Sequence, residues 1–266
     1  MKKLSIVAWL IVSILLVAMV AWAAPIGKIT GITGNVDIMP AGDTQARKLI
    51  TGDTVNTGDI IRTKGKSRVE VSFNDGNILR LAENTRLKIS DYMSGKDKNV
   101  SVISLLRGKI QNTVKNIGGA GGRYEVHTPT SVCGVRGTIL FNYHLNGISG
   151  ALFEKGEGYV YNSKMPQDIQ RITAGHAMIV SGENQAPQLR AFTPGELNTL
   201  KQETNPSSGV FQSLDINSQP GERRGNTLEQ YIPTPGETKP YIPPPPLEHG
   251  HEPPVPPEPP PPRPES

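Results

Sequence analysis

The chain has few of the residues that usually carry covalent chemistry, and Cys133 is its only cysteine. A single cysteine cannot form an internal disulfide, so the folded core has to be held together by packing alone. The neighbouring residues Val132 and Val135 are apolar, which favours a buried thiol over one that is free for a partner. A stretch as long as residues 26–182 is sufficient to bury a core of this kind.

The chain also lacks a strong net charge. Its formal charge is +4, and without Lys2 and Lys3 it is 4 − 2 = +2. So small an excess does not favour binding to nucleic acid or strong attraction to an anionic membrane. We therefore expect no nucleic-acid partner.

Motifs of known active sites are missing as well. The sequence contains no phosphate-binding loop, no G-x-G-x-x-G and no G-x-S-x-G, and no histidine has a second ligand at the spacing of a metal-binding helix. His127 lies six residues before Cys133, but Pro129 interrupts the strand that would bring both to one face. We expect no cofactor and no metal.

The acidic residues that stand out lie in turns. Asp53, Asp59 and Asp75 are each next to a glycine or an asparagine, and an aspartate in a turn usually accepts hydrogen bonds from its own backbone. Carboxylate pairs for glycoside hydrolysis are set by the fold rather than by spacing, but these three carboxylates are expected to be structural. The sequence thus predicts a protein that is not an enzyme.

What the chain does contain is a β pattern. Val69, Val71 and Phe73 alternate with polar residues, which places one set of side chains on each face of a strand. Asp75-Gly76 follows as a two-residue hairpin signal, since both central positions of such a turn need positive φ. Similar runs recur about every eight to twelve residues. They predict an all-β sandwich or roll of about a dozen short antiparallel strands over residues 26–182.

Six short motifs follow one another along this β region: Asp53-Thr54-Val55-x-Thr57-Gly58-Asp59, Asp75-Gly76, Tyr124-x-Val126-x-Thr128-Pro129, Val135-Arg136-Gly137-Thr138, Glu157-Gly158-Tyr159-Val160 and Ala174-Gly175. In this order and spacing they resemble the FecR domain, the periplasmic domain of bacterial iron-citrate-type signal transducers, which also occurs alone in envelope proteins. The resemblance extends over about residues 27 to 182. It implies a periplasmic domain that binds another protein and, in the transducers, receives a signal from an outer-membrane receptor.

Arg136 stands between apolar residues of an expected strand. A buried guanidinium must pair with an acid or with carbonyl groups. Two interpretations remain: an internal tie between two β layers, with Glu157 or Asp59 as its partner, or a buried anchor for the carboxylate of a binding partner.

The first residues predict export. Lys2 and Lys3 precede an apolar run that ends at Val20, and Ala21-Trp22-Ala23 forms an A-x-A cleavage site. Residues 1–24 therefore read as a secretory signal peptide, which predicts a periplasmic or secreted protein. An uncleaved membrane anchor is the alternative, because the apolar run is nearly long enough to span a bilayer.

Three segments interrupt or follow the β region. Four glycines between Gly118 and Gly122 predict a flexible loop. Residues 183–230 are expected to form a linker that contains one short helix. This helix should span Pro194 to Gln202, with Thr193 as its cap and Glu196 in its first turn.

Residues 231–266 form a proline-rich tail, in which sixteen of the 24 prolines of the chain lie. Such a segment cannot bury enough apolar surface to fold. Tyr231-Ile232-Pro233 recurs as Tyr241-Ile242-Pro243, either as a docking motif for an aromatic groove or as part of a spacer.

Together these features predict a non-catalytic cell-envelope protein that acts as a protein-interaction or signal-sensing module. In the transducers an anti-sigma segment precedes a transmembrane helix, whereas only Met1-Lys2-Lys3 stands there in this sequence, so we expect no direct control of a sigma factor. The alternative is an envelope structural or polysaccharide-associated protein whose tail spans the periplasm.

Overall fold

The computed structural model describes residues 24–93, 99–115 and 122–207. Residues 1–23 of the expected signal peptide, most of the glycine-rich loop and the whole proline-rich tail, including Tyr231 and Tyr241, lie outside the described residues. Within the described part, no helix has the length and apolarity needed to cross a membrane.

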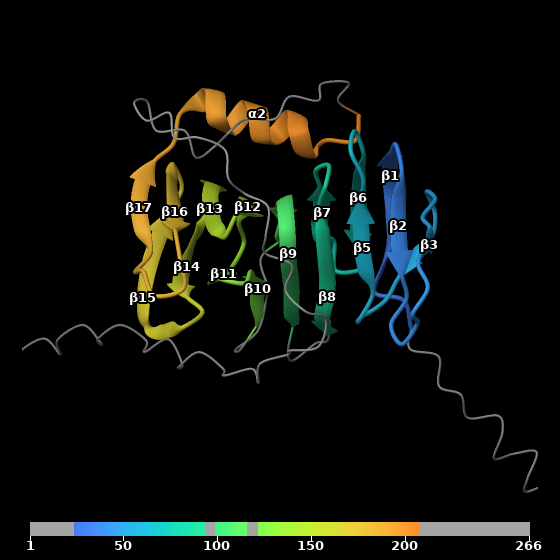
Figure 1. The fold of residues 1–266 in the computed structure, drawn as a ribbon, viewed down its shortest axis with the longest axis horizontal. Coiled ribbons are helices and arrows are strands. Elements are labelled where there is room, and N and C mark those ends of the chain that lie inside the picture. Colours follow the sequence, from blue (N-terminus) through green and yellow to red (C-terminus); the bar gives the residue numbers. More distant parts are fainter. Residues whose placement is uncertain (1–23, 94–98, 116–121, 208–266) are drawn as a thin grey trace, which may run out of the picture. The chain divides into compact units, whose positions relative to one another are not determined.

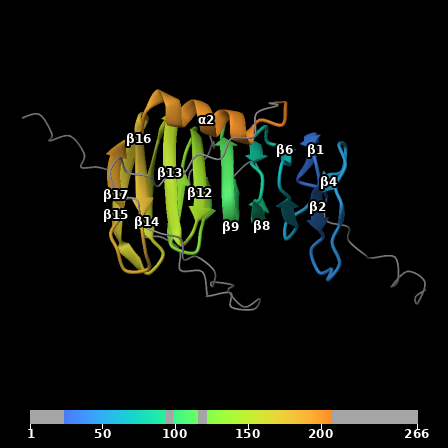
Figure 2. The ribbon, with the colours of Figure 1, turned by 45° about the horizontal axis from the view of Figure 1, so that its top comes forward.

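Most described residues belong to strands, which form two layers. The first layer, sheet A, consists of β4 (Thr54–Val55), β1 (Gly27–Thr33), β6 (Arg68–Phe73), β7 (Ile78–Leu81), the second half of β9 (Val100–Thr113), β12 (Ile139–Leu145), β13 (Ile148–Lys155), β16 (His176–Val180) and β17 (Gln188–Ala191), in this order. Figures 1 and 2 show these strands side by side.

The second layer, sheet B, consists of β3 (Arg47–Lys48), β2 (Val36–Met39), β5 (Ile60–Thr63), β8 (Arg86–Met93), the first half of β9, β10 (Arg123–His127), β11 (Ser131–Val135), β14 (Glu157–Asn162) and β15 (Met165–Thr173), in this order. All pairings in both sheets are antiparallel except the one between β9 and β10. The all-β fold predicted from the sequence is confirmed, with more strands than expected and one parallel pair.

Strand β9 belongs to both layers. Its first half pairs with β8 and β10 in sheet B, and its second half pairs with β7 and β12 in sheet A. The strand passes from one sheet to the other at Gly108, whose φ is 98°. A Cβ atom at this position would overlap the backbone of Thr85, so the crossing requires a glycine.

The core lies between the two sheets. The alternating residues Val69, Val71 and Phe73 are all buried in it, as are Ile61 and Leu87 of sheet B. The predicted alternation along β6 is therefore confirmed, and it places the polar residues between them on the outer face of sheet A.

A second apolar cluster lies on the outer face of sheet A, under helix α2 (Pro194–Thr204). Figure 1 shows this helix crossing the strands. The Thr193 side chain accepts a hydrogen bond from the backbone N–H of Glu196, and the Glu196 side chain accepts one from the backbone N–H of Thr193, so the predicted helix start is confirmed. Leu200 packs on Tyr143 and its neighbours, and β17 pairs with β16. Helix α2 and β17 therefore belong to the packed body.

The hairpin turns differ from the prediction. Of Asp75 and Gly76, only Gly76 has positive φ, and four residues separate β6 from β7. The expected two-residue turn at Asp75-Gly76 is therefore wrong. A two-residue turn instead joins β12 to β13 at Asn146-Gly147, where both φ angles are positive, at 51° and 79°, as such a turn requires.

Candidate functional site

The three aspartates expected in turns, Asp53, Asp59 and Asp75, accept hydrogen bonds from backbone amides. Asp59 accepts hydrogen bonds from the amides of Asn56 at 2.8 Å and Ala41 at 3.0 Å, and Asp53 accepts one from Ile50 at 3.1 Å. Each carboxylate thereby fixes the path of a turn. Gly58 has a φ of 92°, which suits it to the turn before Asp59.

Asp75 connects its turn to sheet B. Its carboxylate accepts hydrogen bonds from the Asn77 amide at 3.0 Å and from the Tyr92 hydroxyl at 2.7 Å. The Tyr92 ring stacks on Phe73, with ring centroids 4.2 Å apart. Burial is the main reason that the pKa of Tyr92 lies above its ordinary value. Gly76, with a φ of 83°, completes this turn.

The glycine-rich motifs of the second half mark close backbone approaches. Thr138 is 1% exposed, and its hydroxyl donates to the carbonyl of Glu157 at 3.1 Å. A Cβ atom at Gly158 would overlap the carbonyl oxygen of Gly134. Gly137 and Gly175 have φ angles of 70° and 86°. These positions shape the backbone and present no reactive group.

Arg136 departs from the expectation. It is exposed, in the bend between β11 and β12, and not buried in a strand. The strand ends at Val135, and Gly137, with positive φ, lies in the bend that follows. The expectation that Arg136 is buried is therefore wrong.

One buried cluster resembles part of a nucleophilic site. The Ser149 hydroxyl lies 2.9 Å from His144 Nδ1, 2.7 Å from the Thr128 hydroxyl and 2.6 Å from the Thr130 hydroxyl. Ser149 is 0% exposed, so no substrate can reach its oxygen. Burial lowers the pKa of His144 to about 4. This network ties the start of β13 to the turn before β11.

A second polar cluster lies on β10 and β14. Glu125 is 0% exposed, and its carboxylate lies 2.8 Å from His127 Nε2 and accepts a hydrogen bond from the Tyr159 hydroxyl at 3.0 Å. Burial alone would raise the pKa of Glu125, but His127 and Tyr159 hold it below the ordinary value. The Tyr159 ring covers Gly134, where a Cβ atom would overlap it. The hydrogen bond to Glu125 and the packing on Gly134 hold the Tyr159 ring in place, which is a structural role.

Cys133 is buried, as predicted. Burial raises the pKa of its thiol to about 12, so it is not a nucleophile at neutral pH. Its cross-strand partner is Val126, whereas His127 pairs with Val132, and the thiol and the imidazole therefore face opposite sides of sheet B. In the described part of the chain, no group of three or more His, Cys, Asp or Glu residues is placed to hold a metal ion.

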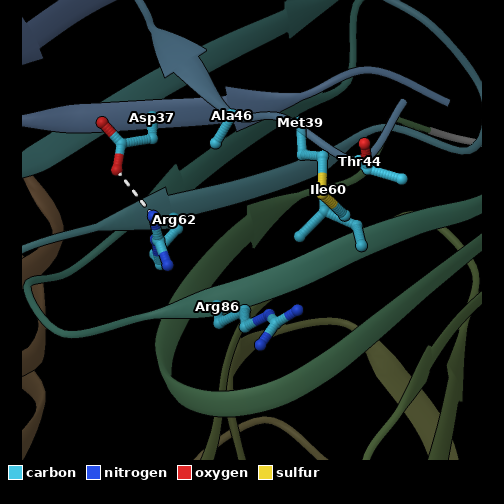
Figure 3. A pocket seen from close by; sticks show the side chains of 7 residues that line it. All are labelled: Asp37, Met39, Thr44, Ala46, Ile60, Arg62 and Arg86. Carbon is cyan, nitrogen blue, oxygen red and sulfur yellow. Dashed lines mark hydrogen bonds and ion pairs between the residues drawn. The ribbon is translucent and has the colours of Figure 1, made fainter. Parts of the chain in front are cut away.

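The structure shows a hollow on the outer face of sheet B that the sequence did not single out. It has a volume of about 280 Å³ and is seen from close by in Figure 3. Its walls come from β2, β5, β8 and the segment before β3, with these side chains: Asp37, Met39, Thr44, Ala46, Ile60, Arg62 and Arg86. No motif in the sequence marks these residues as a group, because the strand register that brings them together depends on the fold.

Asp37 organises the charges of this hollow. Its carboxylate lies 2.9 Å from Arg62 and 3.1 Å from Lys64. Burial would raise the pKa of the Asp37 carboxyl, but the two cations offset this and hold the pKa below its ordinary value. Both cations remain partly exposed, at 38% and 45% of their side chains. The hollow therefore has both apolar and charged side chains in its lining.

With this geometry in view, the comparisons give the class of the domain. Residues 59–150 match the family model described as FecR protein. The chain thus carries a FecR family domain, which extends from β5 to the start of β13. No curated protein matches the chain.

Solved structures show only weak likeness. Two crystal structures of a candidate anti-sigma factor from Parabacteroides distasonis are 14% and 15% identical to this chain, each with a TM-score of 0.45 over 54% of it. The chain spans 64% of the length of each of these structures. A cell surface anchoring domain is 27% identical, with a TM-score of 0.26, over 28% of this chain and 100% of its own length.

Proposed function

We propose that the chain is an exported, non-catalytic module of the cell envelope that binds another protein in the periplasm and senses or relays a signal through it. The observation that carries the proposal is the FecR family domain at residues 59–150. The N-terminal sequence, with Lys2, Lys3 and the A-x-A site, supports export.

The distribution of chemical groups supports binding over catalysis. The thiol of Cys133 and the hydroxyl of Ser149 are both buried, and Glu125 is engaged by two neighbours. The outer face of sheet B, by contrast, combines an accessible hollow with cationic side chains. A hollow that combines apolar and charged side chains is typical of a binding site.

The proposal is tested by amine-reactive crosslinking of the full chain in cells of its source organism. The tagged protein is then purified under denaturing conditions, and the attached molecules are identified by mass spectrometry. An unrelated exported protein with the same tag is the control. We expect one envelope protein to be enriched with this chain and not with the control. Capture of nothing beyond the control contradicts the proposal.

Export is tested separately. We expect the protein to be released with the periplasmic fraction after osmotic shock, and its N-terminus to lie after the A-x-A site, without the signal peptide. A protein that remains with the cytoplasmic fraction contradicts this part of the proposal.

A further inference from the structure

The outer face of sheet B carries a row of charged side chains that crosses four strands. Asp37 on β2 is paired in register with Arg62 on β5, Arg62 with Arg86 on β8, and Arg86 with Arg107 on β9. Residues directly opposite each other in an antiparallel pair project to the same face. Because Ile61 is 0% exposed and faces the core, Arg62 and the row project away from the core.

Three arginines in successive strands repel one another. Like charges directly opposite each other destabilise a sheet, and neighbouring strands lie only about 4.8 Å apart. Asp37 is shared between Arg62 and Lys64. In residues 24–93, 99–115 and 122–207, neither the Arg86 nor the Arg107 side chain has a hydrogen-bonded or ion-paired partner. An anion from outside the chain would offset this repulsion.

The row borders apolar surface. Met39, Ala46 and Ile60 line the hollow beside Arg62 and Arg86, as Figure 3 shows. Its volume of about 280 Å³ lies just below the range of about 300–1,000 Å³ that is typical of small-molecule sites. The space therefore suits an apolar side chain rather than a whole cofactor.

Leu106 extends the apolar surface at the other end of the row. The pairing between β8 and β9 shifts between Arg86 and Leu87, so that Leu106 is an extra residue of β9. Such a bulge directs neighbouring side chains to one face. Leu106 is 42% exposed, so part of its apolar side chain is in contact with water.

We propose that this face binds an extended acidic segment of a partner protein, with its carboxylates on Arg62, Arg86 and Arg107 and one apolar side chain in the hollow. The inference rests on the proposed function and names the chemistry of the partner. Guanidinium groups bind carboxylates through two parallel hydrogen bonds. An extended peptide repeats its side chains on one face about every 6.6 Å, and the long arginine side chains adapt to this spacing.

The composition of the hollow favours a peptide over other polyanions. Its apolar residues are aliphatic, and no aromatic ring lines it, whereas sugar rings pack best on aromatic faces. A lipid headgroup would use the cations but would leave the apolar hollow unfilled. An acidic polysaccharide and an anionic membrane are therefore outcomes that the experiment has to distinguish.

The test measures binding of the full chain to a fluorescent nonapeptide with glutamates at alternate positions around a central leucine. The main variant is Arg86→Glu/Arg107→Glu. Its matched control is Lys155→Glu/Arg171→Glu, which changes the net charge equally at exposed positions outside the row. Thermal unfolding checks each variant, and Arg86→Gln/Arg107→Gln replaces the main variant if the charge reversal prevents folding.

We expect the main variant to lose affinity by at least about tenfold, while the control changes it by less than about twofold. Binding should weaken with rising salt and disappear when the glutamates of the probe are replaced by glutamines. Equal affinity of the main variant and the parent overturns the proposal. So does tighter binding of polygalacturonate, or of vesicles with anionic lipid, than of the peptide.

Failure of this inference is distinguishable from failure of the proposed function. If crosslinking in cells captures a protein but the peptide fails to bind, the module binds its partner elsewhere and only the acidic-segment proposal is wrong. If crosslinking captures no protein, the proposed function itself is wrong.

Discussion

Glu203 at the C-terminal end of α2 and Lys109 on β9 form an ion pair, with the Lys109 amine 3.0 Å and 2.9 Å from the two carboxylate oxygens. Their side chains are only 8% and 11% exposed. Arg68 on β6 donates from Nε to the carbonyl of Glu203 at 2.7 Å. A cation at this end of a helix also complements the helix dipole. These contacts fix α2 on the outer face of sheet A.

Removal of Lys109 tests this attachment. Lys109→Met leaves the Glu203 carboxylate buried without its amine, and we expect it to lower the free energy of unfolding by about 2–4 kcal/mol. Lys155→Met removes an exposed lysine of β13 and should change it by less than about 0.5 kcal/mol. Urea unfolding of both variants measures the difference. Equal effects would show that the ion pair contributes nothing to the docking of α2.

Gly150 on β13 provides space for the Tyr143 ring. A Cβ atom at this position would overlap the ring, and Tyr143 is 1% exposed beneath α2. We expect Gly150→Ala to destabilise the protein by about 1–3 kcal/mol, the usual cost of overpacking. Gly182→Ala is the control, because the nearest atom to its Cβ lies 3.9 Å away. A thermal midpoint equal to that of the parent would mean that Tyr143 moves freely.

The lowered pKa of His144 should make the stability of the protein depend on pH. Burial lowers its pKa from 6.5 to about 4, so as the pH falls the unfolded chain takes up a proton before the folded chain does. This group therefore contributes its full stability above pH 6.5, and the contribution is lost as the pH falls toward 4. His144→Asn keeps a polar group near Ser149 and removes the titration. We expect the loss of stability between pH 7 and pH 4 to be smaller in this variant, measured by urea unfolding at each pH.

Cys133 should be unreactive in the folded protein. Its thiol is 1% exposed, and burial raises its pKa to about 12. We expect a thiol reagent to label it only as fast as the protein unfolds, and therefore faster in urea. Rapid stoichiometric labelling without denaturant would contradict the position of Cys133 in the core.

Local sequence signals predicted the elements well. Alternation identified β6, and the Thr193-Pro194 start with Glu196 identified α2, because these signals depend on neighbouring residues alone. The turn signals were less specific. Asn146-Gly147 and Asp75-Gly76 have similar composition, but only the first connects strands that pair up to the turn itself.

The position of a residue in the folded protein could not be predicted from its sequence neighbours where it depends on distant parts of the chain. Arg136 stands in an apolar sequence, yet it is exposed because the strand ends one residue earlier. The division of β9 between two sheets depends on partners far along the chain. The row of Arg62, Arg86 and Arg107 likewise exists only through the register of three strands, which no single stretch of sequence shows.

The central claim is that the outer face of sheet B binds a protein. It is tested most directly by a photo-reactive amino acid at position 88, in place of Lys88, which pairs with Ile60 of the hollow across β5 and β8. Position 155 on β13 is the control. After irradiation of living cells, we predict a discrete protein adduct from position 88 and none from position 155. Adducts of equal yield at both positions, or none at position 88, would contradict the account.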